Sequence, residues 1–205
     1  STEDEHFDSF AAMYYEELEK LYGKAKYYSM DPFHEGGNTE GVDLAKAGTS
    51  IMGAMKKANP EAVWVMQAWQ ANPREAMVNT LDSGDLLVLD LYSEKLPQWG
   101  DPESMWYREK GFGKHDWLYC MLLNFGGNVG LHGRMEQLVN GYYNACAHIN
   151  GKTLRGVGAT PEGIENNPMM FELLYELPWR EERFSPDIWL QGYLKARYGG
   201  ELSPE

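Results

Sequence analysis

Two glutamates that each precede a glycine are the residues of this chain best suited to chemistry. Glu35 lies in the stretch 27–37 (YYSMDPFHEGG), and Glu162 lies in the turn 160–163 (TPEG). Each follows a turn that contains proline, which restricts its direction, and the glycine lets a substrate approach the backbone closely. Two carboxylates in an aromatic-rich chain without a metal motif meet the requirements for hydrolysis of a glycosidic bond. This pair is the candidate catalytic centre.

Other kinds of site are less well supported. A single glutamate in a loop is also typical of a surface or helix-capping position, and only the placement of two of them at strand ends favours a site. His34 and His132 could form a metal site with Asp31 and Glu35. However, a histidine next to a glutamate on a strand points to the opposite side, and no i, i+4 ligand pair exists. No GxSxG, GxGxxG or P-loop motif occurs. The sequence therefore predicts neither a metal nor a cofactor.

The composition fits one domain, or one domain with the start of another. The 205 residues are 43% hydrophobic and 13% aromatic, enough for a core and for ring platforms that could hold sugars. The net charge of −13 argues against nucleic acid as a partner, and the absence of an eighteen-residue apolar run argues against a membrane span. Cys120 and Cys146 lie in apolar runs without a metal-binding spacing, so we expect two buried free thiols.

The pattern of apolar residues predicts about five strands that alternate with helices. Such alternation implies a parallel sheet with right-handed crossovers. It fits either an open α/β sheet or the last five strands of a (β/α)8 TIM barrel, and we favour the barrel because both glutamates then lie on its C-terminal face. The expected strands are 27–30, 62–69, 86–92, 117–124 and 153–159, and the expected helices are 7–21, 44–58, 73–81, 131–149, 168–177 and 186–198, with a long loop over 93–114.

Five sequence blocks contain most of the residues expected at the strand ends. They are 28–37 (YSMDPFHEGG), 62–69 (AVWVMQAW), 87–92 (LVLDLY), 120–128 (CMLLNFGGN) and 158–163 (GATPEG). In this order they resemble the α-N-acetylglucosaminidases of glycoside hydrolase family 89. His34 makes the bacterial branch the closer likeness, since the lysosomal branch has Asn there. The resemblance implies a partial (β/α)8 catalytic domain over residues 1–178 and, over 179–205, the first helix of a C-terminal α-helical domain.

The resemblance also implies a retaining, exo-acting hydrolase that removes terminal α-linked N-acetylglucosamine. Glu35 would be the general acid/base and Glu162 the nucleophile, with their carboxyls about 5–5.5 Å apart. We expect Glu35 to be the more desolvated of the two, because it must be protonated for the first step. The positions that the resemblance places around the terminal sugar are His34, Trp69, Leu91, Leu122 and Phe125.

The expected partner is a heparan-type or mucin-type glycan that ends in this sugar. We expect a periplasmic or extracellular location, although this chain contains no secretory signal. Because the resemblance covers only the later part of the barrel, we expect the chain alone to be inactive, and its open sheet edge calls for a second chain or self-association to complete the barrel. The alternatives are a catalytically incomplete fragment and a sugar-binding module without hydrolysis.

Overall fold

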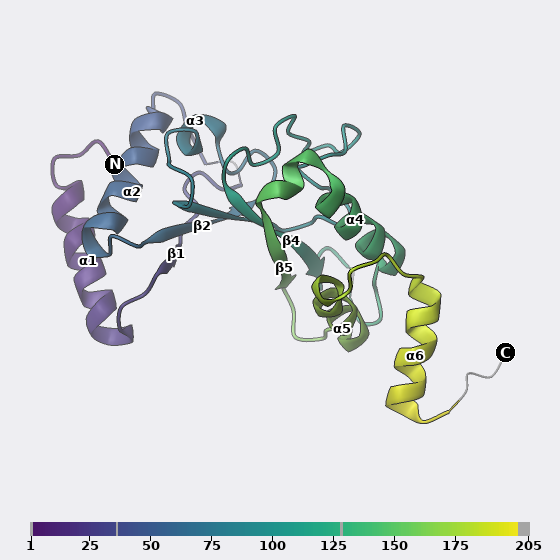
Figure 1. The fold of residues 1–205 in the computed structure, drawn as a ribbon. Coiled ribbons are helices and arrows are strands. Elements are labelled where there is room, and N and C mark those ends of the chain that lie inside the picture. The colour runs from purple at the N-terminus through teal and green to yellow at the C-terminus, as the bar shows by residue number, and fades with distance from the viewer. Residues whose placement is uncertain (1, 36, 128, 201–205) are drawn as a thin grey trace. The chain divides into compact units, whose positions relative to one another are not determined.

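A computed structural model describes residues 2–35, 37–127 and 129–200 of the chain. They form two compact units, one of residues up to Asp90 with 112–118, and one of residues 91–111 with 119 onward. We call these the first and the second unit (Figure 1). The helices are α1 Phe7–Tyr22, α2 Leu44–Ala58, α3 Glu75–Val78, α4 Met135–Ala147, α5 Pro168–Glu176 and α6 Pro186–Tyr198, and the strands are β1 Tyr27–Ser29, β2 Val63–Ala68, β3 Leu86–Asp90, β4 Asp116–Leu123 and β5 Leu154–Pro161.

The first unit is built on three parallel strands in the order β1-β2-β3. Tyr28 lies opposite Trp64, and Trp64 lies opposite Leu86. The side chains of β2 alternate in burial, with Trp64 and Met66 completely buried and the face that includes Gln67 half-buried. Because residues 62–69 are nearly all apolar, the sequence predicts a strand covered on both faces. The structure shows full cover on one face only.

Helix α2 connects β1 to β2, as a β/α crossover requires. It begins at Asp43, whose side chain accepts a hydrogen bond of 3.0 Å from the backbone N–H of Lys46. Its buried face repeats every three or four residues through Ala47, Ile51 and Met55. The predicted bounds of this helix are confirmed.

The second unit contains the neighbouring strand β5 and most of β4, which are joined by α4. The end of β4 is fully buried from Cys120 to Leu123, and α4 buries Leu138 and Val139. Helix α5 begins as predicted, because Asn167 accepts a hydrogen bond from Met169 N at 3.2 Å and proline occupies the first helical position. Helix α6 begins in the same way at Ser185.

Several sequence predictions need correction. The helix expected over 73–81 is only the single turn Glu75–Val78, and the helix expected from 131 begins at Met135. The long loop predicted over 93–114 is confirmed, because these residues contain no helix or strand. Cys146 is exposed, whereas Cys120 is buried. Cys146 follows the buried Ala145 near the end of α4, and one residue along a helix turns the side chain by about 100° toward solvent.

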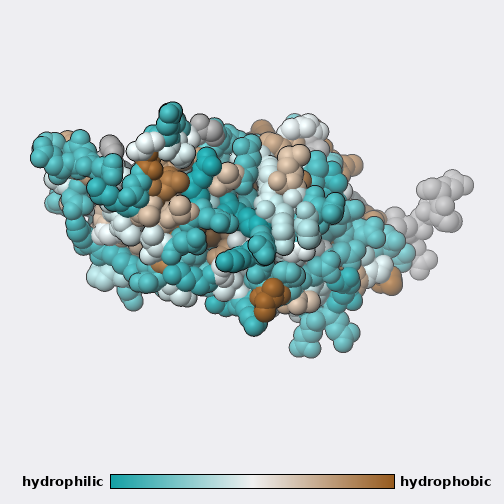
Figure 2. Space-filling model, turned by 90° about the horizontal axis from the view of Figure 1, so that it is seen from above, coloured by the Kyte–Doolittle hydropathy of each residue, from teal (hydrophilic) through white to brown (hydrophobic). Residues whose placement is uncertain are grey.

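The surface is mainly hydrophilic on the face shown in Figure 2, with separate hydrophobic patches. Helix α1 exposes a row of large apolar side chains that includes Phe10, Met13 and Leu21. Within the described ranges, no helix has both the length and the apolar character needed to cross a bilayer.

The domain boundary predicted between residues 178 and 179 stays a prediction. Helix α6 packs on α5 within the second unit, where Trp189 donates a hydrogen bond to Glu176.

Two glycines of α2 provide a test of the packing in the first unit. A Cβ added to Gly48 would lie 2.4 Å from the carbonyl oxygen of Met77, whereas one added to Gly53 would meet nothing within 4 Å. We therefore expect Gly48→Ala to lower the free energy of unfolding by about 1–3 kcal/mol. Gly53→Ala, the matched control, should raise it by about 0.5–1 kcal/mol because alanine favours the helix. Urea unfolding measures both, and equal effects would contradict this packing.

Candidate active site

The segment that carries Glu35 leaves β1 and is bound to the next strand by hydrogen bonds. Met30 N donates to Val65 O at 3.2 Å, and the indole Nε1 of Trp64 donates to Met30 O at 2.8 Å. These contacts hold the segment against β2 immediately before it turns at Asp31-Pro32. Glu35 therefore belongs to a loop beyond the strand, not to the strand itself.

Asp31 is the polar centre of this loop. Its Oδ1 accepts a hydrogen bond from Gln67 N at 2.7 Å and another from Asn72 Nδ2 at 3.1 Å. Burial raises the pKa of the Asp31 carboxyl above its ordinary value, although the Gln67 N–H, nearby His34 and Asn72 act in the opposite direction. Sequence reasoning considered Asp31 only as a metal ligand, and its partners, 36 and 41 positions away, could not be predicted from periodicity.

The backbone after the strands is strained. Phe33 and Glu35 follow β1 with φ of 62° and 45°, Gln70 follows β2 with φ of 53°, and Asn124 follows β4 with φ of 55°. Left-handed backbone is costly for residues with a Cβ, and such strain is concentrated at functional sites. In each unit, these positions therefore support the prediction that functional residues follow the ends of the strands.

The turn that carries Glu162 is held in the second unit by a short chain of amide groups. Glu162 N donates to Leu123 O at 3.2 Å, which ties the residue after β5 to the end of β4. Asn124 Nδ2 donates to Asn166 Oδ1 at 2.8 Å, and Asn166 Nδ2 donates to Gly163 O at 3.1 Å. A Cβ on Gly163 would come within 3.1 Å of the Asn124 Cβ, so glycine allows this close approach. Asn166 was not predicted, because its partners become neighbours only in the folded chain.

The structure divides the predicted site residues between the two units. The first unit contains His34, Glu35 and Trp69, and the second contains Leu91, Leu122, Phe125 and Glu162. The separation of about 5–5.5 Å between the two carboxyls stays a prediction.

Exposure distinguishes the predicted residues further. Both Glu35 and Glu162 are exposed, so the greater desolvation expected for Glu35 is not found, because each lies in a loop that projects beyond its strand. Leu122 is 2% exposed, Leu91 6% and Trp69 9%, which places their side chains largely in the core. Phe125 is half-buried, and its ring packs edge-on against Tyr92 with 6.1 Å between centroids. His34 is half-buried, with Nδ1 lacking a hydrogen-bond partner among the described residues.

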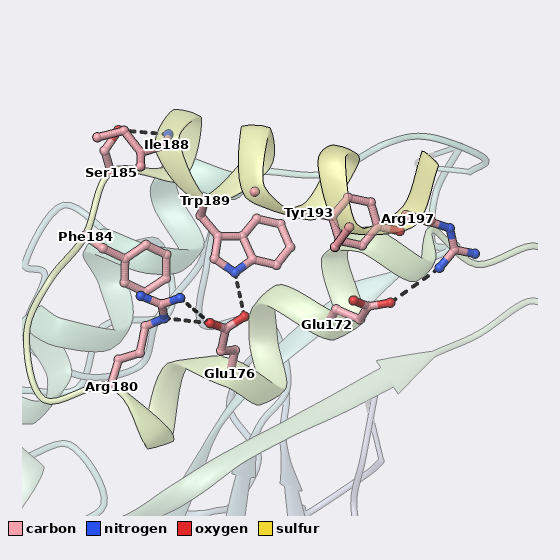
Figure 3. Close-up of a pocket in the computed structure, with 11 residues that line it drawn as sticks. Glu172, Glu176, Arg180, Phe184, Ser185, Ile188, Trp189, Tyr193 and Arg197 are labelled. Atoms are coloured by element: carbon pink, nitrogen blue, oxygen red, sulfur yellow. Dashed lines mark hydrogen bonds and ion pairs between the residues drawn. The ribbon is translucent and has the colours of Figure 1, made fainter. Parts of the chain in front are cut away.

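A separate cavity of about 560 Å³ lies along α5 and α6 in the second unit (Figure 3). Trp189 Nε1 donates to Glu176 Oε2 at 2.6 Å, and the rings of Trp189 and Tyr193 stack with 5.3 Å between centroids. None of the predicted site residues lines it. Glu176 also forms an ion pair with Arg180, and we therefore assign no catalytic role to this cavity despite its size. In the described part of the chain, no three His, Cys, Asp or Glu side chains are grouped so that they could hold a metal.

Comparison with known proteins decides the family. Residues 1–181 match the family model described as "Alpha-N-acetylglucosaminidase (NAGLU) tim-barrel domain". The chain belongs to this family. The match confirms the resemblance seen in the sequence and favours part of a TIM barrel over an open α/β sheet.

Individual members of the α-N-acetylglucosaminidase family agree with this assignment. The chain is 35% identical to human α-N-acetylglucosaminidase over 210 residues, which cover 96% of this chain and 27% of the human protein. The family 89 glycoside hydrolase from Clostridium perfringens in complex with PUGNAc has a TM-score of 0.84 and 32% identity, over 98% of this chain and 22% of that one. The chain thus spans about a quarter of the length of these relatives.

A second similar structure contains a substrate. It is the Clostridium perfringens enzyme with two glutamates replaced by glutamine, in complex with its substrate GlcNAc-α-1,4-galactose, with a TM-score of 0.83 and 32% identity, over 98% of this chain and 22% of that one.

The raised pKa of Asp31 predicts a pH-dependent stability. The Asp31 carboxyl binds its proton more tightly in the folded chain than in the unfolded chain, where its ordinary pKa is 3.8. Protonation of Asp31 therefore contributes fully to the free energy of unfolding below pH 3.8, and this contribution is lost as pH rises through the folded pKa. Asp31→Asn cannot ionise. We therefore expect the free energy of unfolding of Asp31→Asn to increase relative to that of the wild type as pH rises from about 4 to about 7.

Urea unfolding across this pH range measures the difference. Glu61→Gln, which removes an exposed carboxylate from the first unit, controls for the loss of one negative charge. A difference between Asp31→Asn and wild type that stays constant, or that shrinks as pH rises, would contradict the raised pKa.

Proposed function

We propose that this chain carries the catalytic pair of a retaining, exo-acting glycoside hydrolase that removes terminal α-linked N-acetylglucosamine. The observation that carries the proposal is the match of residues 1–181 to the family's barrel domain, within which two glutamates follow strand ends in fixed turns. The Clostridium perfringens complex supports it, because that enzyme holds an α-linked N-acetylglucosamine substrate when two of its glutamates are replaced by glutamine.

In the first step Glu162 attacks the anomeric carbon on the face opposite the leaving oxygen. An ester bond forms between C1 and the Glu162 carboxylate while the bond from C1 to the leaving oxygen breaks. The protonated carboxyl of Glu35 gives its proton to that oxygen, so the aglycone leaves as a neutral alcohol. The backbone bond from Glu162 N to Leu123 O helps to fix the direction of the nucleophile.

In the second step water takes the place of the aglycone. The Glu35 carboxylate accepts a proton from the water as its oxygen bonds to C1, and the bond from C1 to Glu162 breaks. Two inversions at C1 leave the released sugar in the α configuration. Glu35 ends protonated and Glu162 ionised, which restores the starting state.

The substrate itself explains why the protein should supply the nucleophile. In an α-linked N-acetylglucosaminide the 2-acetamido group lies on the same side of the ring as the leaving oxygen. It cannot attack C1 from the opposite face, so assistance by the substrate is blocked. A retaining reaction therefore needs a nucleophile from the protein on that opposite face, and we assign this role to Glu162.

The family resemblance assigns the remaining predicted residues, which are divided between the two units, to the terminal sugar. Phe125 is half-buried, and His34 lies one residue from Glu35. Leu91, Leu122 and Trp69 are buried within their own units. We place the target sugar at the end of a heparan-type or mucin-type glycan in the periplasm or outside the cell, which stays a prediction from the family resemblance.

Separate replacement of the two glutamates tests the assignment in the full-length protein. We expect Glu35→Gln to lower kcat for an aryl α-N-acetylglucosaminide with a poor leaving group by about 10²–10⁴-fold, the usual contribution of a general acid. Glu162→Gln should remove turnover more completely, because no covalent intermediate can form. The matched controls are Glu40→Gln and Glu165→Gln, two exposed glutamates near the predicted pair in sequence. Full turnover in both Glu35→Gln and Glu162→Gln would contradict the proposal.

Azide distinguishes the two roles. With an activated aryl substrate, Glu162→Ala should accept azide on the vacated face and give the β-glycosyl azide. Glu35→Ala still forms the ester, so azide should then give the α-glycosyl azide. NMR of the products reads the configuration directly. The α-azide from Glu162→Ala and the β-azide from Glu35→Ala would mean that the two glutamates have the opposite roles. If the wild type bound the sugar without hydrolysing it, the sugar-binding module would be favoured.

A further inference from the structure

We propose that Asp31 is a positioning residue for Glu35. Its carboxylate ties the loop after β1 to the end of β2 and so fixes the direction in which Glu35 leaves the strand. The inference rests on the proposed function, in which Glu35 is the general acid/base.

The tie is a closed network of three residues. Asp31 Oδ1 accepts hydrogen bonds from Gln67 N at 2.7 Å and from Asn72 Nδ2 at 3.1 Å. Asn72 Nδ2 also donates to Gln67 O at 2.5 Å, so the same amide bridges the carboxylate and the strand. Gln67 lies in β2 and Asn72 in the turn beyond it. One carboxylate oxygen thus joins two segments that are far apart in sequence.

The network lies directly before the part of the loop with left-handed backbone. Met30 is bound to β2 through its N–H and its carbonyl, and Pro32 restricts the backbone after Asp31. Phe33 and Glu35 then adopt left-handed φ of 62° and 45°. Such a conformation persists only where the surroundings over-determine it. Asp31 supplies the last side-chain anchor before those positions.

Asp31 could act on Glu35 through its hydrogen bonds or through its negative charge, and substitution by asparagine distinguishes the two. If its hydrogen bonds position the loop, asparagine should serve, because its side-chain oxygen can accept both bonds. If its negative charge acts on Glu35, asparagine should fail as badly as alanine. The geometry, with both donors on a single oxygen, assigns positioning.

Kinetics in the full-length protein test this assignment. We expect Asp31→Ala to lower kcat by about 100-fold, the usual result of misplacing a catalytic group by about 1 Å, with KM nearly unchanged. Asp31→Asn should recover most of kcat. Asn72→Ala, which removes one of the two donors, should cause a smaller loss.

The control is Asp43→Ala, which removes a comparable hydrogen bond that the backbone N–H of Lys46 donates to an aspartate at the start of α2. It should lower the melting temperature and leave kcat unchanged. Wild-type kcat in Asp31→Ala would overturn the proposal, and so would an Asp31→Asn variant as impaired as Asp31→Ala.

Hydrogen exchange gives a second readout that does not depend on turnover. Asp31→Ala should speed exchange in peptides that cover residues 31–35 and 64–68, whereas Asp43→Ala should not. If the wild type failed to hydrolyse the substrate, the proposed function would fall, and the exchange data would still decide whether Asp31 holds the loop. Unchanged exchange in Asp31→Ala would overturn the anchor itself.

Discussion

Parallel pairing of strands is the constraint on which the candidate site depends. In a parallel sheet the carboxyl ends of neighbouring strands meet at one edge, so the turns after them become neighbours although they are far apart in sequence. In the first unit this places the loop after β1 against the end of β2, where Asp31 bonds Gln67. In the second unit it places Glu162 against Leu123 at the end of β4. Each glutamate is thus held by the strand next to its own.

Local signals in the sequence were enough to predict much of the fold. Helix α2 combines an aspartate cap with an apolar face of helical period, and α5 and α6 each begin with a capping residue followed by proline. Other features could not be predicted locally. The apolar residues from 131 suggested an earlier start for α4, and Cys146 looked buried because its neighbours are apolar, whereas exposure depends on which face of α4 meets the core.

In the candidate site, too, some features could be predicted from the local sequence and others could not. Glu35 and Glu162 could be singled out because glutamate, proline and glycine occur together after strands, and the family resemblance gave each a role. The residues that hold them could not, because Asn72 and Asn166 act through contacts that exist only after folding. The burial of Leu122 likewise follows from the packing of β4. A motif can therefore identify candidate reacting residues, whereas the residues that position them are found only from the tertiary structure.

Trapping of the covalent intermediate tests the central claim most directly. An activated 5-fluoro α-N-acetylglucosaminyl substrate should form the ester faster than water removes it, because fluorine slows both steps and the good leaving group restores only the first. Peptide mass spectrometry of the labelled full-length protein then locates the sugar. The account predicts one added glycosyl group on the peptide that contains Glu162. A label on another residue, or turnover with no covalent adduct, would contradict it.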